Sequence, residues 1–257
     1  MAEARALSRS GVVGQGAKEF LRAHTIDLAG GLLFLLFAIF IGWPIFTVLV
    51  KSVYGSEGFT PEFYRKFFTA YFYRSFLNTL FLGALTTFVC ITAGFCIAFI
   101  TTRGPHFLRI PLKWITLLPL IAPPYIFALS LIILFGRNGL ITEALNLRWD
   151  IFGFPGCVIA QTLAFIPLAY LMIENTLSSL DPSLEDSAAN LGASEGKVLR
   201  SIIIPLLTPS FLKAILIVYV MAVAEFGNVA ILCGRTPFLA PDIYTIITGV
   251  EHDFNMA

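Results

Sequence analysis

Five long apolar runs separated by charged segments organise the chain. They cover about residues 26–50, 76–102, 112–135, 158–173 and 202–233, and the fourth can extend back through residues 152–155. A helix needs about 20 mostly apolar residues to cross the hydrocarbon core of a bilayer. Charged side chains close the first two runs at Lys51 and Arg103. The pattern predicts an all-α integral membrane protein with five visible spans, the last long enough to need a tilt or a break.

These apolar runs contain more prolines than helices that only anchor a protein in the membrane would need. Proline removes a backbone donor and kinks a helix, and freed backbone groups are tolerated where they are buried in protein or line a water-filled cavity. We therefore favour a bundle of spans that encloses a path. The prolines within or at the ends of the runs are Pro44, Pro119, Pro123, Pro124, Pro167, Pro205 and Pro209.

The composition agrees with a membrane protein and excludes two other classes. Of the 257 residues, 57% are hydrophobic and 13% charged, against roughly 45–50% and about 25% in soluble domains. A net charge of +1 provides no field that would attract nucleic acid. The four cysteines lack CxxC spacing and the three histidines stand singly, so we expect no disulfide framework, no metal site and no cofactor.

The polar N-terminus and the loop charges predict the orientation of the spans. A signal peptide has its apolar core within about the first 30 residues, whereas residues 1–25 are polar and basic. We expect a cytoplasmic tail at 1–25, an uncleaved first span at 26–51, an outer loop at 52–75 and a core domain at 76–257. The basic loop after the second span is also cytoplasmic under the positive-inside rule, although Arg65, Lys66 and Arg74 on the outer side weaken the bias.

The outer loop is rich in aromatic residues. Thr60-Pro61-Glu62 has the pattern of a helix start, with a capping residue, a proline and an acid. Such aromatic density beside a span predicts an anchor at the lipid headgroups. The aromatic residues that follow are Phe63, Tyr64, Phe67, Phe68, Tyr71, Phe72 and Tyr73.

The long polar stretch at 178–207 lies between the fourth and fifth spans. Asp181 followed by Pro182 predicts a helix start, and Gly192 predicts its end, because a C-terminal cap commonly needs the left-handed conformation. Ser194 can cap a second helix that leads into the fifth span. The first helix has a narrow apolar stripe of Leu184, Ala188 and Leu191, too small to anchor in lipid, and its small residues predict a surface made for a partner.

At this point the residues resemble a known family. The segment from Asp186 to Pro205 is similar to the EAA motif, EAA-x3-G-x9-I-x-L-P, of permease subunits of binding-protein-dependent ABC importers, with Ile204 in place of Leu. The resemblance assigns ATPase coupling to residues 181–196 and the start of the fifth span. The residues concerned are Leu184, Glu185, Asp186, Ser187, Ala188, Ala189, Leu191, Gly192, Ile202 and Pro205.

Three further segments, at 75–80, 119–142 and 224–232, resemble the ferric-iron branch of this family. Branches for thiamine, polyamines, phosphonates, sulfate and molybdate share much of the pattern. The resemblance implies the transmembrane domain of a type I importer in the bacterial inner membrane. Its implied partners are a cytoplasmic ATPase dimer, a periplasmic substrate-binding protein and a second permease module, fused or separate. The chain has no GxxxxGK[ST] phosphate loop, so ATP hydrolysis would belong to the ATPase partner.

Five crossings from a cytoplasmic start would leave the C-terminus outside, whereas the core of this family returns through a sixth span. We therefore expect a fragment truncated before the last span, from the N-terminal module of a larger fused permease. Two interpretations of Glu225 are open. It can line the translocation path with Asn228 near an outer gate, at a break that Gly227 permits, or the helix can end near Ala224 and leave Glu225 solvated.

Two other classes of protein compete with the importer permease. A stand-alone secondary transporter would use an intramembrane ionisable group such as Glu225, but it would not explain the EAA spacing. A membrane enzyme would need convergent catalytic groups, and the chain has no HExxH motif and no Ser-His constellation.

Overall fold

The computed structural model describes residues 25, 27–55, 58–59, 69–146 and 149–248. It divides into two compact units, with the boundary between residues 65 and 66. Residues 1–24 of the expected tail at 1–25 lie outside the described residues. So do the helix start at Thr60-Pro61-Glu62, most of the aromatic loop and residues 249–257.

The first unit contains the expected first span as a helix over Asp27–Val53. Its turns widen to a π-helix, η1 (Ala38–Gly42), before α2 (Trp43–Val53). A proline ring clashes with the carbonyl four residues earlier, and the wider turn lies just before Pro44. A two-residue hairpin, β1 (Tyr54–Gly55) with β2 (Gly58–Phe59), follows and is a small departure from the expected all-helical chain.

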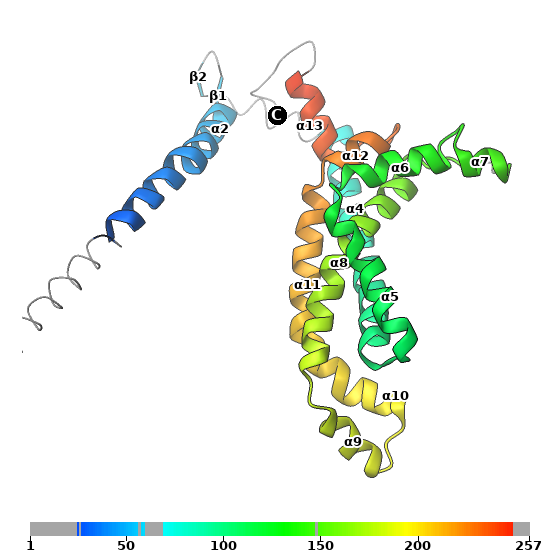
Figure 1. The fold of residues 1–257 in the computed structure, drawn as a ribbon. Coiled ribbons are helices and arrows are strands. Elements are labelled where there is room, and N and C mark those ends of the chain that lie inside the picture. The colour runs from blue at the N-terminus through cyan, green and yellow to red at the C-terminus, as the bar shows by residue number, and fades with distance from the viewer. Residues whose placement is uncertain (1–24, 26, 56–57, 60–68, 147–148, 249–257) are drawn as a thin grey trace, which may run out of the picture. The chain divides into compact units, whose positions relative to one another are not determined.

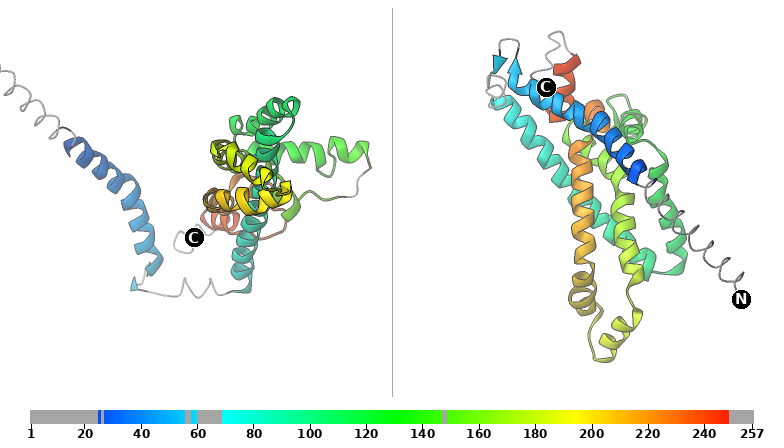
Figure 2. Two further views of the ribbon diagram at one scale, coloured as in Figure 1. Left: turned by 90° about the horizontal axis from the view of Figure 1, so that it is seen from below. Right: turned by 90° about the vertical axis from the view of Figure 1, so that its left-hand side faces the viewer.

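The described residues of the second unit form helices joined by loops, with no strand among them. In chain order its elements are α4 (Ala70–Arg103), α5 (His106–Leu117), η2 (Leu118–Ile121), α6 (Tyr125–Phe135), α7 (Leu140–Ala144), α8 (Phe154–Ser179), α9 (Pro182–Asn190), α10 (Glu195–Val198), η3 (Leu199–Ile203), α11 (Ile204–Ala224), α12 (Gly227–Leu232) and α13 (Leu239–Thr248). The helices α4, α8 and α11 run side by side (Figures 1 and 2). Figure 1 shows α9 and α10 at one end of this bundle and α6, α12 and α13 at the other.

Five helices in the described part of the chain are long and apolar enough to cross a membrane, as the sequence predicts. They are Asp27–Val53, Ala70–Arg103, Tyr125–Ala144, Phe154–Ser179 and Glu195–Ala224. The third differs from the expected run at 112–135, which the structure breaks into α5, the 3₁₀-helix η2 and α6. Pro119, Pro123 and Pro124 lie at this break, and each removes a backbone donor from a helix.

The fifth run also differs from one continuous span at 202–233. The helix begins earlier, at Glu195, and passes through the π-helix η3 just before Pro205. It ends at Ala224, and α12 starts after a two-residue break. The sequence predicts that this run needs a tilt or a break, and the structure has a break.

The core lies where α4, α8 and α11 meet. At Gly94 of α4 an added Cβ would lie 3.0 Å from both the Ala169 Cβ and the Tyr170 backbone nitrogen of α8. The helices therefore approach closely because position 94 has no side chain. One buried cluster lies at the α9 end of the bundle and is called the α9-end cluster below. Its members are Ala98, Tyr170, Ile173, Leu177, Val198, Ile203 and Leu207.

We expect Gly94→Val to destabilise the bundle. The added methyl groups would have to displace the α8 backbone, and overpacking of this kind costs about 1–3 kcal/mol. Ala84→Val, at an exposed position of α4, is the matched control and should be neutral. The measurement is the thermal midpoint of the detergent-purified protein, and equal midpoints for the two variants would contradict the close approach.

Candidate functional site

The helix α9 is specified locally by its two caps. The backbone nitrogen of Ser183 donates to the Asp181 carboxylate at 2.9 Å, and this bond lowers the pKa of Asp181. At the other end Gly192 has φ +81°. There the Gly192 nitrogen donates to the Ala189 carbonyl and the Ala193 nitrogen to the Ala188 carbonyl, a Schellman cap. Both predicted ends of the helix are confirmed.

Most of the surface of α9 is exposed. None of its residues is buried, and Leu191, which follows it, is 88% exposed. Asp186, Ser187 and Ala189 are also exposed. Glu185 and Ala188 are only partly exposed, and Ala188 packs against the α9-end cluster. One face of the helix therefore packs against the bundle, and the rest of its surface is open to solvent or to a partner.

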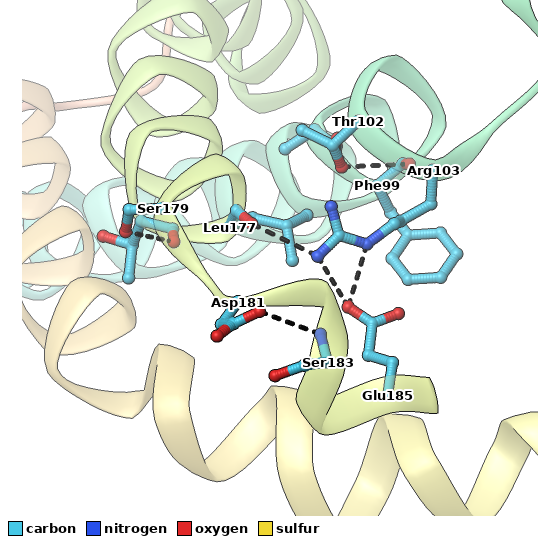
Figure 3. Close-up of polar contacts among 10 residues, drawn as sticks. Phe99, Thr102, Arg103, Leu177, Ser179, Asp181, Ser183 and Glu185 are labelled. Carbon is cyan, nitrogen blue, oxygen red and sulfur yellow. Dashed lines mark hydrogen bonds and ion pairs between the residues drawn. The ribbon is translucent and has the colours of Figure 1, made fainter. Parts of the chain in front are cut away.

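An ion pair fixes α9 to the end of α4. Arg103 Nη2 lies 2.6 Å and Nε 3.0 Å from Glu185 Oε1, and Nη2 also donates to the Leu177 carbonyl of α8 at 3.4 Å (Figure 3). The two side chains are only 23% and 26% exposed. Charge-assisted bonds of this kind are stronger than neutral ones. Arg103 therefore joins the ends of α4, α8 and α9.

Sequence reasoning missed the role of Arg103. It treated this residue as the charge that closes the second span and gave Glu185 a place in the coupling region without a partner. One signal was available, since the predicted topology puts both residues on the same side of the membrane.

Three of the predicted coupling residues, Glu185, Asp186 and Ala189, line one cavity. This cavity has a volume of about 390 Å³ and lies between α4, α9 and α10. Ile202 packs against the α9-end cluster, whereas Pro205 at the start of α11 is exposed. The cavity is lined by Phe99, Arg103, Glu185, Asp186, Ala189, Ala193, Glu195, Val198, Leu199 and Ile203.

The second predicted pair, Glu225 and Asn228, lies at the break near the opposite end of the bundle. Glu225 is half-buried, and its Oε1 accepts a hydrogen bond from the backbone nitrogen of Asn228 at 3.1 Å. The Asn228 side chain is fully buried, with no hydrogen-bond partner in the described part of the chain. The helix ends at Ala224, as the solvated-loop interpretation requires, but Glu225 is not fully solvated. A role for the pair in the translocation path stays a prediction.

Gln161 is a further polar residue at this break that sequence reasoning did not single out. Its Nε2 donates to the Ala222 carbonyl of α11 at 3.1 Å, and its Oε1 accepts from Thr86 Oγ1 of α4 at 2.9 Å. The Ala222 carbonyl is among the last four of α11, which have no intrahelical donor. The side chain of α8 therefore supplies the missing donor.

The chain matches a family model described as "Binding-protein-dependent transport system inner membrane component" over residues 90–249. It belongs to this family. The matched residues include both α9 and the helix break, so both are parts of an ABC importer permease. The permease is a multi-pass inner-membrane protein, and the expected fold and family are confirmed.

The permease is similar to individual proteins that are named for different substrates. It is 32% identical to the ferric transport system permease protein FbpB of Actinobacillus pleuropneumoniae over 230 residues, which cover 87% of this chain and 34% of the relative. It is 26% identical to the molybdenum transport system permease protein ModB of Mycobacterium bovis, over 74% of this chain and 70% of that protein. The permease spans about a third of the length of the FbpB relative.

A solved structure shares the fold. It is a bacterial alginate ABC transporter in complex with an alginate pentasaccharide-bound periplasmic protein. One of its chains has a TM-score of 0.78 and 17% identity, with 93% of the permease and 88% of that chain covered. This likeness shows the transmembrane fold.

We expect Arg103→Gln to loosen α9 from the bundle. Losing hydrogen bonds to a charged group costs about 1.5 kcal/mol or more, which corresponds to roughly a tenfold increase in local opening. Hydrogen exchange of the amides at 182–190 measures this opening. Lys113→Gln is the matched control, because it removes the more exposed Lys113–Glu174 pair at 3.3 Å. Equal protection of α9 in the two variants would contradict the clamp.

Proposed function

We propose that the permease forms part of the translocation path of an ATP-driven importer and that α9 is the helix that its ATPase binds. The observation that carries this proposal is a short helix with both ends capped, which Arg103 and Ala188 hold on the bundle while most of its surface stays exposed. The EAA-like residues Asp186, Ser187 and Ala188 lie on this helix. A partner could therefore bind α9 without unfolding the bundle.

The attachment of α9 explains how a partner could move the spans. Asp181 lies two residues after the end of α8, and Arg103 ties α9 to α4. A displacement of α9 would be passed directly to two long helices. ATP-driven closure of the partner would in this way rock the spans between outward-open and inward-open states.

The proposed orientation places α9 and the N-terminus in the cytoplasm. An ATPase dimer would bind at the α9 end and a periplasmic substrate-binding protein at the opposite end. A second permease module, fused or separate, would complete the path. ATP hydrolysis would belong to the ATPase partner, because the chain contains no phosphate-loop motif.

The substrate that we propose is ferric iron, on the similarity to the FbpB relative. The similarity to ModB favours an oxyanion such as molybdate as the second candidate. Uptake of radiolabelled iron and molybdate into proteoliposomes, using the complete permease with its ATPase and binding protein, separates the two. Molybdate uptake without iron uptake would overturn the first proposal.

We expect Gly192→Val to uncouple the ATPase. At φ +81° a side chain costs roughly 1–2 kcal/mol, and the strained turn would shift α9. Substrate-stimulated ATPase activity should fall about fivefold or more while membrane insertion persists. Gly196→Val is the matched control, because both glycines have open space around them and only Gly192 has a positive φ. Wild-type stimulation of the ATPase by substrate in Gly192→Val would contradict the proposal that the ATPase binds α9.

We also propose that Glu225 and Asn228 line the path near its outer gate. Glu225→Gln keeps an oxygen that can accept from the Asn228 nitrogen and removes the charge. Uptake should fall severalfold with unchanged assembly with the ATPase, whereas Glu143→Gln, an exposed carboxylate of α7, should leave uptake intact. Full uptake in Glu225→Gln, together with labelling of Glu225→Cys from outside in every state, would support the solvated loop instead.

A further inference from the structure

A second cavity opens at the end of the bundle opposite α9. Its volume is about 690 Å³, and it lies where the chain leaves α6, enters α8 and leaves α12 (Figure 1). It is lined by Arg137, Asp150, Phe152, Gly153, Gly234, Arg235 and Thr236. Neither the predicted coupling region nor the proposed path uses these residues.

The charged side chains that line this cavity carry a net charge of one positive unit, which an anionic ligand could balance. Its lining contains two arginines and one aspartate. Arg137 Nη2 lies 3.4 Å from Asp150 Oδ2, with the side chains 78% and 55% exposed, and so exposed a pair contributes little. Arg235 is exposed and forms no ion pair within the described residues. Both guanidinium groups are therefore available to an incoming anion.

The backbone beneath these arginines is fixed. The Gly153 nitrogen donates to the Leu232 carbonyl at 2.7 Å, and the Thr236 nitrogen donates to the Cys233 carbonyl at 3.0 Å. The Phe152 nitrogen donates to Asp150 Oδ1 at 3.1 Å, and the Arg137 guanidinium lies 6.0 Å from the centre of the Phe152 ring. The Gly153 bond thereby joins the loop before α8 to the end of α12. A ligand would meet a cavity whose frame is already in place, which reduces the entropy lost on binding.

We propose that this cavity binds an acidic side chain of the periplasmic substrate-binding protein. The inference rests on the proposed function, which makes this end of the bundle the outer one. Guanidinium groups present forked donors that match a carboxylate. The single net positive charge of the lining suits one carboxylate. The cavity also lies among the loops at the end of the bundle, the part that a protein outside the membrane reaches first.

The test is a titration of binding protein against the complete permease and its ATPase in proteoliposomes. Arg235→Glu should raise the half-saturating concentration of binding protein about tenfold or more. The maximal uptake rate and basal ATPase activity should stay unchanged, which also shows that the variant folds. Arg235→Lys should keep part of the wild-type affinity. Arg74→Glu is the matched control, since Arg74 is an exposed arginine near the start of α4 and does not line the cavity.

Salt and lipid separate the possible sources of the anion. Added salt should weaken wild-type binding more than Arg235→Glu binding, because screening acts on the exposed charges. Phosphatidylcholine vesicles should preserve the Arg235 effect, and an effect that requires anionic lipid would overturn the proposal in favour of a headgroup. An unchanged half-saturating concentration in Arg235→Glu, or an equal shift in Arg74→Glu, would overturn it as well. Wild-type permease without any uptake that depends on the binding protein would overturn the proposed function and this inference together.

Discussion

A backbone donor or acceptor left unpaired away from water costs several kcal/mol, and this constraint governs the break between α11 and α12. Gln161 of α8 donates to the Ala222 carbonyl on one side of the break. Glu225 accepts from the Asn228 nitrogen on the other side, and Thr86 of α4 orients Gln161. The break is therefore stabilised by side chains of α4 and α8 and by Glu225 of the break itself, and it is a built feature of the bundle.

Features that depend on a short stretch of chain could be predicted from the sequence. The spans follow from length and hydropathy, because crossing a bilayer demands both. The caps of α9 follow from Asp181 and Gly192, whose conformational preferences act within a few residues. The boundaries of the third span could not be predicted, because hydropathy does not report the helix breaks at Pro119, Pro123 and Pro124.

Contacts between distant residues escaped the sequence for a different reason. Arg103 and Glu185 are 82 positions apart, and Thr86 and Gln161 are 75 apart. No local pattern pairs them, since their meeting depends on how α4 and α8 pack. The close approach at Gly94 is what brings these helices together, and one glycine in an apolar run gives no sign of it.

The two candidate sites are joined by the same two helices. Along α4, Thr86 contributes to the break and Arg103 holds α9, about 25 Å apart at 1.5 Å per residue. Along α8, Gln161 contributes to the break and the Leu177 carbonyl accepts a hydrogen bond from Arg103. The two connections differ, because α4 contains no proline whereas α8 contains Pro167 between its two contacts. Proline removes a hydrogen bond from the helix interior, so α4 is the unbroken connection between the exposed helix and the break, and α8 is the one with a built-in point of bending.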